Sequence, residues 1–378
     1  MGKLAEFNPK SNLPEKFEYV DLESVVGTEL VGHRLENRDS APSRAQRLAK
    51  KNDVFYQTVR PYQKNNYLFD LPYDNYVFST GYAQMRPSGN GYFLLTLVQE
   101  EKFVNRVLER STGTSYPAIS SNDLAKLSVR VPADIEEEQN IGKFFSNLDN
   151  LVTLHQRKLD QLKELKTAYL QVIFPVKDER VPKLRFADFE EEWELCKLGD
   201  LANIVGGGTP NTNNPKCWDG NIDWYAPAEI KEKIYVTGSK KRITELGLQK
   251  SSAKVLPIGT VLFTSRAGIG NTAILAKKGT TNQGFQSIIP NKNKLDTYFI
   301  FSRTHELKKY GEAVGAGSTF VEVSGKQMAK MPMLTPRFNE QQAIGMFFKK
   351  IDDIITLHQN KLEQLKDLKT SYLQNMFI

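Results

Sequence analysis

The chain has 378 residues, of which 40% are hydrophobic and 25% charged, the composition of a globular protein with two or three domains. It contains no apolar run of membrane-spanning length and no signal sequence at its start, so we expect a cytoplasmic protein without a membrane partner. Its two cysteines, Cys196 and Cys217, are too few for a disulfide framework or a metal site and are consistent with a reducing compartment.

The net charge of +7 is unevenly distributed along the chain. Residues 1–131 carry +2 and residues 182–335 carry +6, whereas residues 132–181 carry −2 and residues 336–378 carry +1. A polyanion such as nucleic acid would therefore meet the two more basic segments. The alternative is that a pI near 9.0 is common among proteins of many functions.

The first segment, residues 1–131, is predicted to form a domain made mainly of strands. A basic stretch at residues 43–51 predicts a helical turn within it. Runs rich in Val, Phe, Tyr and Thr predict strands at residues 54–59, 76–80, 92–98 and 127–132.

Basic and aromatic side chains gather in this domain between residues 34 and 64. Cations suit phosphate oxygens and aromatic rings can stack on bases, so the stretch is a candidate DNA-binding surface. The alternative is a solvated face with ordinary core tyrosines. The candidate residues are Arg34, Arg38, Arg44, Arg47, Arg60, Tyr62 and Lys64.

One stretch of the chain occurs twice. Residues 139–174 recur as residues 342–377, with 22 of 36 positions identical at an offset of 203. In both copies apolar residues recur at heptad spacing, which predicts a long helix with a coiled-coil seam. Additional leucines widen this apolar stripe, and a widened stripe implies more than one neighbour. His155 and His358 are equivalent seam positions and are predicted to be polar interface residues rather than ligands.

These patterns divide the chain into domains. We predict helical spacers at 132–174 and 336–378, and a linker at 175–192, which is charged and contains two prolines. A helix over residues 140–173 would be roughly 50 Å long, which corresponds to on the order of 15 base pairs of DNA.

The second domain, residues 193–335, contains several glycine-rich loops. They lack the Lys-Ser/Thr pair of a phosphate-binding loop, and no signature of a zinc protease, hydrolase, kinase or amino-methyltransferase occurs, which argues against catalysis. Loops of Gly, Thr, Asn, Gln and Arg suit close approach to DNA and hydrogen bonds to bases, although each residue could instead form a structural turn or cap. The candidates are Gly208, Thr209, Asn211, Arg266, Asn282, Gln283, Ser318 and Thr319.

Two diverged domains that alternate with two nearly identical helices indicate a tandem duplication. The lead PKLRFADFEEEWELCKLGDL, the loops GGGTP and TNQGF, and the helix starts EEQNIGKFF and EQQAIGMFF carry a further resemblance. Over essentially its whole length the chain resembles the specificity subunit of type I restriction–modification systems.

The resemblance implies an α+β fold. Two α/β target recognition domains, related by a pseudo-two-fold, would be separated by two long antiparallel coiled-coil helices. Each domain would read one half of a bipartite site in double-stranded DNA, with the helices as a ruler.

The resemblance also implies a non-catalytic chain that docks two methyltransferase subunits, and then restriction subunits, through its helices. S-adenosylmethionine, ATP and Mg²⁺ would be held by those partners, with no cofactor on this chain. The alternatives are a stand-alone DNA-binding regulator and a catalytic DNA methyltransferase or nuclease. The docking candidates are Leu151, Leu154, His155, Leu165, Ile354, Leu357, His358 and Leu368.

Overall fold

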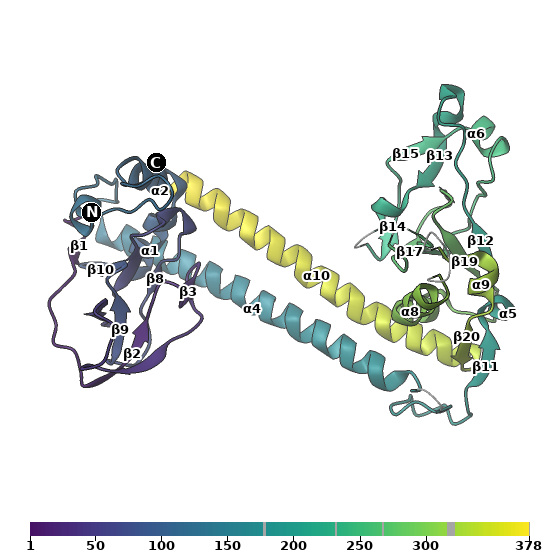
Figure 1. Ribbon diagram of the computed structural model, residues 1–378, viewed down its shortest axis with the longest axis horizontal. Helices are drawn as coiled ribbons and strands as arrows, with labels where there is room; N and C mark the ends of the chain where they lie inside the picture. The colour runs from purple at the N-terminus through teal and green to yellow at the C-terminus, as the bar shows by residue number, and fades with distance from the viewer. Residues whose placement is uncertain (177–178, 231–232, 267, 316–321, 378) are drawn as a thin grey trace. The chain divides into compact units, whose positions relative to one another are not determined.

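The computed structural model describes residues 1–176, 179–230, 233–266, 268–315 and 322–377. They form two compact units. Unit 1 comprises Met1–Lys158 and His358–Ile378, and unit 2 comprises Leu159–Leu357. Each unit holds one α/β domain together with a part of each long helix, α4 (Ile135–Ile173) and α10 (Phe338–Met376), which Figure 1 shows in blue-green and yellow.

The domain of unit 1 is built on two four-stranded sheets. Their strands are β1 (Ala5–Phe7), β2 (Lys16–Val20), β5 (Arg34–Asn37), β6 (Ala45–Leu48), β7 (Val54–Gln57), β8 (Tyr67–Leu68), β9 (Tyr76–Ser79) and β10 (Tyr82–Pro87). The orders are β1-β10-β7-β8 and β5-β2-β9-β6, and only the β2–β9 pair among these described strands is parallel. A hairpin of β3 (Val25–Val26) and β4 (Glu29–Leu30) stands apart.

Short helices complete unit 1. They are the 3-10 turn η1 (Pro61–Gln63), α1 (Gly91–Gln99), α2 (Glu101–Glu109) and α3 (Ser121–Ala125). Helix α1 places Phe93 and Leu97 in one core with Phe145 of α4 and with Phe377, which follows α10. This core joins the α/β domain of unit 1 to the long helices.

The structure corrects three of the strand and turn predictions in unit 1. Residues 92–98 form α1, because Asn90 caps the segment by accepting a hydrogen bond from the Phe93 amide, and burial on most sides removes the helical periodicity that would identify it. Residues 43–51 contain strand β6, paired with β9, rather than a helical turn. Residues 127–132 form no strand, whereas their counterpart in unit 2, β20 (Pro332–Thr335), pairs with β11 (Glu194–Lys197).

The domain of unit 2 contains a five-stranded sheet of order β12-β19-β16-β17-β14 and a three-stranded sheet of order β15-β13-β18. The strands are β12 (Ala202–Gly206), β13 (Trp218–Tyr225), β14 (Tyr235–Val236), β15 (Lys241–Ile243), β16 (Val261–Phe263), β17 (Thr272–Leu275), β18 (Thr280–Thr281) and β19 (Gln286–Pro290). The helices are α5 (Leu198–Leu201), α6 (Glu245–Gln249), α7 (Thr297–Ser302), α8 (Thr304–Gly315) and α9 (Gly325–Ala329), with 3-10 turns η2 (Pro215–Cys217) and η3 (Pro227–Glu229).

The same Tyr-Asp-Lys triad anchors the domain to the helices in each unit. In unit 1 the Tyr92 hydroxyl donates to Asp149 Oδ2 over 2.6 Å, and Lys369 Nζ lies 2.6 Å from Asp149 Oδ1. In unit 2 the Tyr298 hydroxyl donates to Asp352 Oδ2 over 2.8 Å, and Lys166 Nζ lies 2.6 Å from Asp352 Oδ1. Burial, with the adjacent carboxylate, raises the pKa of both tyrosines. Each aspartate thus pairs with the lysine of the other copy of the repeat, Asp149 with Lys369 in unit 1 and Asp352 with Lys166 in unit 2.

Beside each triad, a glycine of the long helix allows a short helix of the domain to approach closely. A Cβ on Gly142 would lie 2.4 Å from Oδ1 of Asn90, and a Cβ on Gly345 would lie 2.4 Å from Oδ1 of Asp296. Asn90 and Asp296 are the N-caps of α1 and α7. The glycine in both copies of the repeat therefore lets a domain helix start against a long helix.

Within each unit the two long helices run antiparallel. In unit 1, Asp149 pairs with Lys369 and, further along α4, His155 contacts His358, further back along α10. The two histidine Nδ1 atoms are 2.9 Å apart, so one imidazole donates and the other accepts. No helix within the described ranges is apolar enough over sufficient length to span a membrane.

Candidate nucleic-acid interface

In unit 2 the loop after β12 lies against the loop that follows β18. A Cβ on Gly207 would lie 1.9 Å from the Asn282 carbonyl oxygen, so only glycine permits this approach. The amide of Gly208 donates to the Thr281 carbonyl over 2.8 Å, and the Gly208 carbonyl accepts from Trp224 Nε1 over 2.8 Å. The backbone of Gly208 thus holds the two loops together, and its contact with DNA stays a prediction.

The loop pair brings four of the predicted polar residues together. Thr209 Oγ1 contacts Oε1 of Gln283, and a Cβ on Gly284 would lie 3.0 Å from Asn282 Oδ1 and 3.6 Å from Arg266 Nε. Asn282 Oδ1 accepts from the Gly284 amide over 2.7 Å, and the NH₂ group of the same side chain is a hydrogen-bond donor. We name Thr209, Arg266, Asn282 and Gln283 the loop cluster.

The loop cluster offers hydrogen-bond donors of the kind that read base edges. Arg266 has a partly exposed side chain and lies 4.0 Å from Glu322, which is a long ion pair that a stronger acceptor could replace. A guanidinium can donate two bonds to guanine, and an amide can pair with adenine. Asn211 is exposed next to the cluster, and its side chain accepts from the Asn213 amide. The predicted residues Ser318 and Thr319 lie outside the described residues.

A second basic surface of unit 2 was missed at the sequence level. Arg242 and Lys277 both contact the buried Asp223, at 3.4 and 3.2 Å, and Lys241 lies 5.7 Å from the centre of the Trp218 ring. Burial opposes ionisation of Asp223, but hydrogen bonds from Ser239 and Lys277 outweigh burial and lower its pKa. The basic runs at 240–242 and 277–278 were the signal in the sequence that could have identified it. This β15 patch consists of the exposed residues Lys240, Lys241, Arg242, Lys277 and Lys278.

In unit 1 one group of predicted cations lies on and around β5 and β6. Arg34 is held by Asp21 at 2.6 Å and Glu36 at 2.8 Å, and these bonds raise its pKa. Arg44 is exposed, and Arg38 Nη1 donates to the Leu13 carbonyl. Arg47 is half-buried, and burial lowers its pKa. Arg34 is therefore held in two short ion pairs, whereas the ion pair of Arg38 with Asp39 is long, at 4.0 Å.

The second group surrounds the η1 turn. The Arg60 guanidinium lies 4.3 Å above the centre of the exposed Tyr116 ring, and Lys64 is paired with Glu101. Tyr62, between them, is half exposed. An arginine stacked on an exposed tyrosine is a surface that suits phosphate and base contacts. Tyr116 is a residue that the sequence did not single out.

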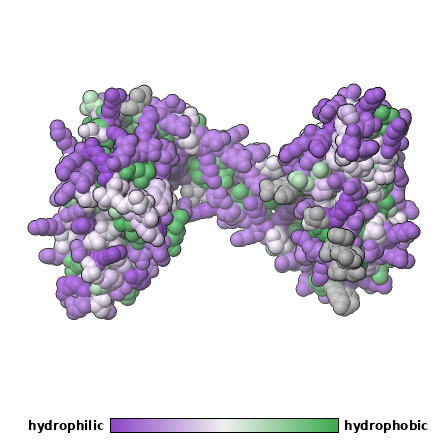
Figure 2. Space-filling view, turned by 45° about the horizontal axis from the view of Figure 1, so that its top comes forward, coloured by the Kyte–Doolittle hydropathy of each residue, from purple (hydrophilic) through white to green (hydrophobic). Residues whose placement is uncertain are grey.

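The predicted docking residues divide into exposed and paired positions. The two histidines face each other, as described above. The six apolar residues are all exposed, and Figure 2 shows hydrophobic residues set into the mostly hydrophilic surface of the molecule. These six are Leu151, Leu154, Leu165, Ile354, Leu357 and Leu368.

Known proteins share both the sequence pattern and the fold. The type I restriction enzyme MjaIX specificity subunit of Methanocaldococcus jannaschii is 33% identical over 191 residues, which are 50% of this chain and 44% of that protein. The type I restriction enzyme HindI specificity subunit of Haemophilus influenzae is 22% identical over 433 residues, which cover 94% of this chain and 93% of that protein.

Two solved structures have the same fold. The S subunit of a type I restriction–modification system from M. genitalium superposes with a TM-score of 0.66 at 14% identity, covering 100% of this chain and 94% of that one. A chain from a type I system, solved in a study of its assembly and conformational transition, gives a TM-score of 0.52 at 22% identity, covering 98% and 95%.

The family described as type I restriction modification DNA specificity domain matches residues 43–164 and 190–367. Each matched stretch joins one α/β domain to the long helix that follows it, and the two anchoring triads show the same duplication in three dimensions. Since the matches span most of the chain, it belongs to the type I restriction–modification DNA specificity family and carries two copies of that domain.

Proposed function

We propose that this chain is the non-catalytic specificity subunit of a type I restriction–modification enzyme, and that each unit reads one half of a bipartite site in double-stranded DNA. The observation that carries the proposal is the contrast within the duplication. The anchoring triads and glycines are the same in the two units, whereas the polar surface residues differ. Two readers of different sequences need that combination, because recognition is set by the side chains that reach base edges.

In unit 2 the loop cluster would supply the base contacts and the β15 patch would supply phosphate contacts. Donors from Arg266 and Asn282 suit guanine and adenine, whereas the ammonium and guanidinium groups of the patch suit phosphate oxygens without regard to sequence. In unit 1 the η1 group around Arg60 and Tyr62 would have the corresponding role. The divergence of these surfaces supports different half-sites.

The exposed apolar residues of the long helices would dock the methyltransferase subunits. Leu151, Leu154 and Leu165 of α4 are equivalent to Ile354, Leu357 and Leu368 of α10, at the offset of 203. The same exposed set in both copies favours two identical partners. Those partners, and restriction subunits with them, would hold S-adenosylmethionine, ATP and Mg²⁺. The two helices would set the distance between half-sites.

The experiment is selective methylation in a reconstituted complex. The full chain should methylate no DNA by itself and should direct methylation of a bipartite motif once its methyltransferase subunits are added. Methylation or cleavage by the chain alone would refute a non-catalytic role, and binding of the motif without any effect of partners would favour a stand-alone regulator.

A substitution locates the reader in unit 2. Arg266→Ala should weaken or relax one half-site only, by about 1–3 kcal/mol if the contact to guanine is bidentate. The matched control is Arg337→Ala, which removes an exposed arginine of unit 2 that is paired with Glu191, away from the loop cluster. An equal loss at both half-sites, or an equal effect of the control, would contradict the assignment.

A further inference from the structure

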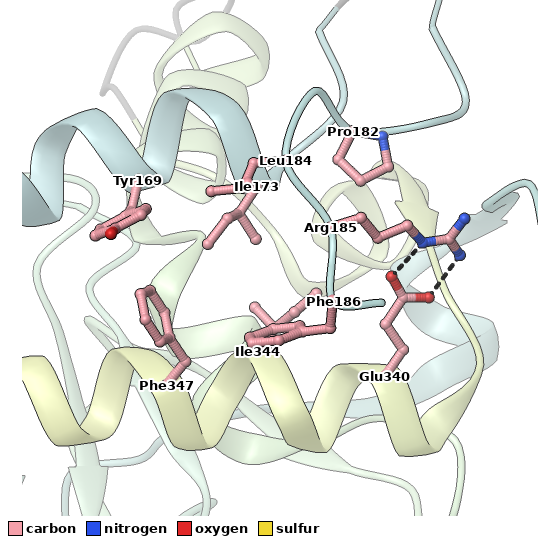
Figure 3. Close-up of a pocket in the computed structure, with 9 residues that line it drawn as sticks. All are labelled: Tyr169, Ile173, Pro182, Leu184, Arg185, Phe186, Glu340, Ile344 and Phe347. Atoms are coloured by element: carbon pink, nitrogen blue, oxygen red, sulfur yellow. Dashed lines mark hydrogen bonds and ion pairs between the residues drawn. The ribbon is translucent and has the colours of Figure 1, made fainter. Parts of the chain in front are cut away.

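In unit 2 the segment that follows α4 folds back over the start of α10. The Arg185 guanidinium donates from Nε and Nη2 to the two carboxylate oxygens of Glu340, both over 2.8 Å, as the dashed lines of Figure 3 show. Trp193 Nε1 donates to the same carboxylate over 3.3 Å. The Glu340 side chain is 2% exposed, so this bidentate pair is buried under the segment.

Apolar contacts accompany the ion pair. Phe186 packs edge-on against Phe347 at 6.0 Å between ring centres, and the amide of Leu184 donates to the carbonyl of Val172 over 2.9 Å. A cavity of about 200 Å³ remains between the segment and the two helices, lined also by Tyr169 and Ile344 (Figure 3). The helix ends of unit 2 thus form a receptor for an arginine followed by an aromatic residue.

Unit 1 carries the same receptor on the equivalent repeat positions. Glu137, Phe144 and Tyr372 stand at the offset of 203 from Glu340, Phe347 and Tyr169. The rings of Phe144 and Tyr372 meet edge-on at 5.0 Å, as those of Phe347 and Tyr169 do at 4.9 Å. The ring pair of unit 1 therefore has the same geometry as the ring pair of the occupied receptor.

The two receptors differ in how far their side chains are exposed to solvent. Phe144 and Tyr372 are each 38% exposed and Met376 is 40% exposed, whereas Ile173, the counterpart of Met376 in unit 2, is 4% exposed. Glu137 is exposed as well. Among the described residues of unit 1, none covers this face as residues 182–186 cover its counterpart, so a carboxylate and an apolar surface of known fit lie open to solvent.

We propose that this face of unit 1 binds a segment of a partner protein in which an arginine precedes an aromatic residue, with Glu137 receiving the guanidinium and Phe144 the ring. The charges of the residues around Glu137 further indicate which kind of segment would bind. In unit 2 the neighbours of Glu340 are Arg337, Asn339 and Gln341, whereas the neighbours of Glu137 at those positions are Asp134, Glu136 and Glu138. The more acidic surroundings in unit 1 suit a segment that carries additional basic residues.

The test uses the full chain and a labelled synthetic peptide of its own residues 180–187, RVPKLRFA, as the probe. Fluorescence anisotropy should show binding with one peptide per chain. Glu137→Gln should weaken it about tenfold or more, because a charge-assisted bidentate pair is lost, and a peptide with alanine at the position of Arg185 should lose as much. The matched control is Glu136→Gln, which removes an equal exposed charge on the neighbouring residue and should change binding by less than about twofold.

Other outcomes overturn the proposal. Peptide binding that is unchanged both by Glu137→Gln and by the alanine in place of the peptide's arginine would show that unit 1 has no such receptor. Absence of binding by the wild-type chain would show the same. Binding that is lost on Glu340→Gln but kept on Glu137→Gln would place the peptide in unit 2. Self-association of the chain that Glu137→Gln abolishes, measured by light scattering, would assign the face to a second copy in place of a partner protein.

Discussion

The two anchoring triads allow the cost of a buried charge to be compared at equivalent positions. The Asp352 side chain is 5% exposed and pairs with Lys166, whereas the Asp149 side chain is 23% exposed and pairs with Lys369. Breaking a buried pair leaves an unpaired charge and costs about 3–5 kcal/mol, while an exposed pair contributes about 0–1 kcal/mol. We expect Asp352→Asn to destabilise unit 2 by about 3 kcal/mol, and Asp149→Asn to destabilise unit 1 by about 1–2 kcal/mol because water partly screens its pair.

Tryptophan fluorescence separates the two effects. The three tryptophans, Trp193, Trp218 and Trp224, all lie in unit 2, so their emission during urea unfolding reports that unit. Asp352→Asn should lower the fluorescence midpoint much more than Asp149→Asn, and circular dichroism should detect both changes. A double variant that replaces both charged residues of the pair in unit 2, Lys166 by Met and Asp352 by an apolar residue, should recover part of the lost stability. Equal fluorescence shifts for the two single variants, or a cost below about 1 kcal/mol at 352, would refute the reasoning.

Three further changes test the anchors and the helices. Gly345→Ala should destabilise unit 2 by about 1–3 kcal/mol in the same urea assay, because its Cβ would meet Asp296 Oδ1 at 2.4 Å. Burial raises the pKa of Asp296, so its ionised form is disfavoured in the folded state; Asp296→Asn should stabilise unit 2 by less than about 1 kcal/mol at pH 7, with the gain falling as the pH drops through that raised pKa. Leu154→Lys and Leu357→Lys, at side chains 62% and 66% exposed, should leave the unfolding midpoint unchanged and reduce methyltransferase binding in pull-down or calorimetry.

The sequence predicted the duplicated helices well because their signal is local and repeated. Heptad spacing identifies the seam, and Leu159, Leu162, Ile351 and Ile355 are indeed buried in unit 2. Helix α1 was predicted wrongly as a strand for the opposite reason. Its residues are buried on most sides, so a short apolar run carried no period that distinguishes helix from strand.

The candidate interface was predictable only in its composition. The glycine-rich loops pointed to Thr209, Arg266 and Gln283, and the structure brings the first and last into contact. The contact of the Gly208 carbonyl with Trp224 could not be predicted from the sequence, because the two residues are 16 positions apart and nothing in the sequence pairs them. The β15 patch was missed because two short basic runs, 240–242 and 277–278, become one surface only through the contacts of Arg242 and Lys277 with Asp223.

Each long helix contributes residues to both units, and this limits which changes the repeated sequence can tolerate. Asp149 and Lys166 belong to one copy of the repeat, yet Asp149 is paired in unit 1 and Lys166 in unit 2, each with a residue of the other copy. A change at Asp149 therefore has to remain compatible with Lys369, and a change at Lys166 with Asp352, each of which belongs to the other copy of the repeat. Among the residues that the structure describes, the side chains of the loop cluster make no such reciprocal contact between the two copies of the repeat. That difference is consistent with helices that keep 22 of 36 positions identical beside surfaces, proposed to read DNA, that have diverged.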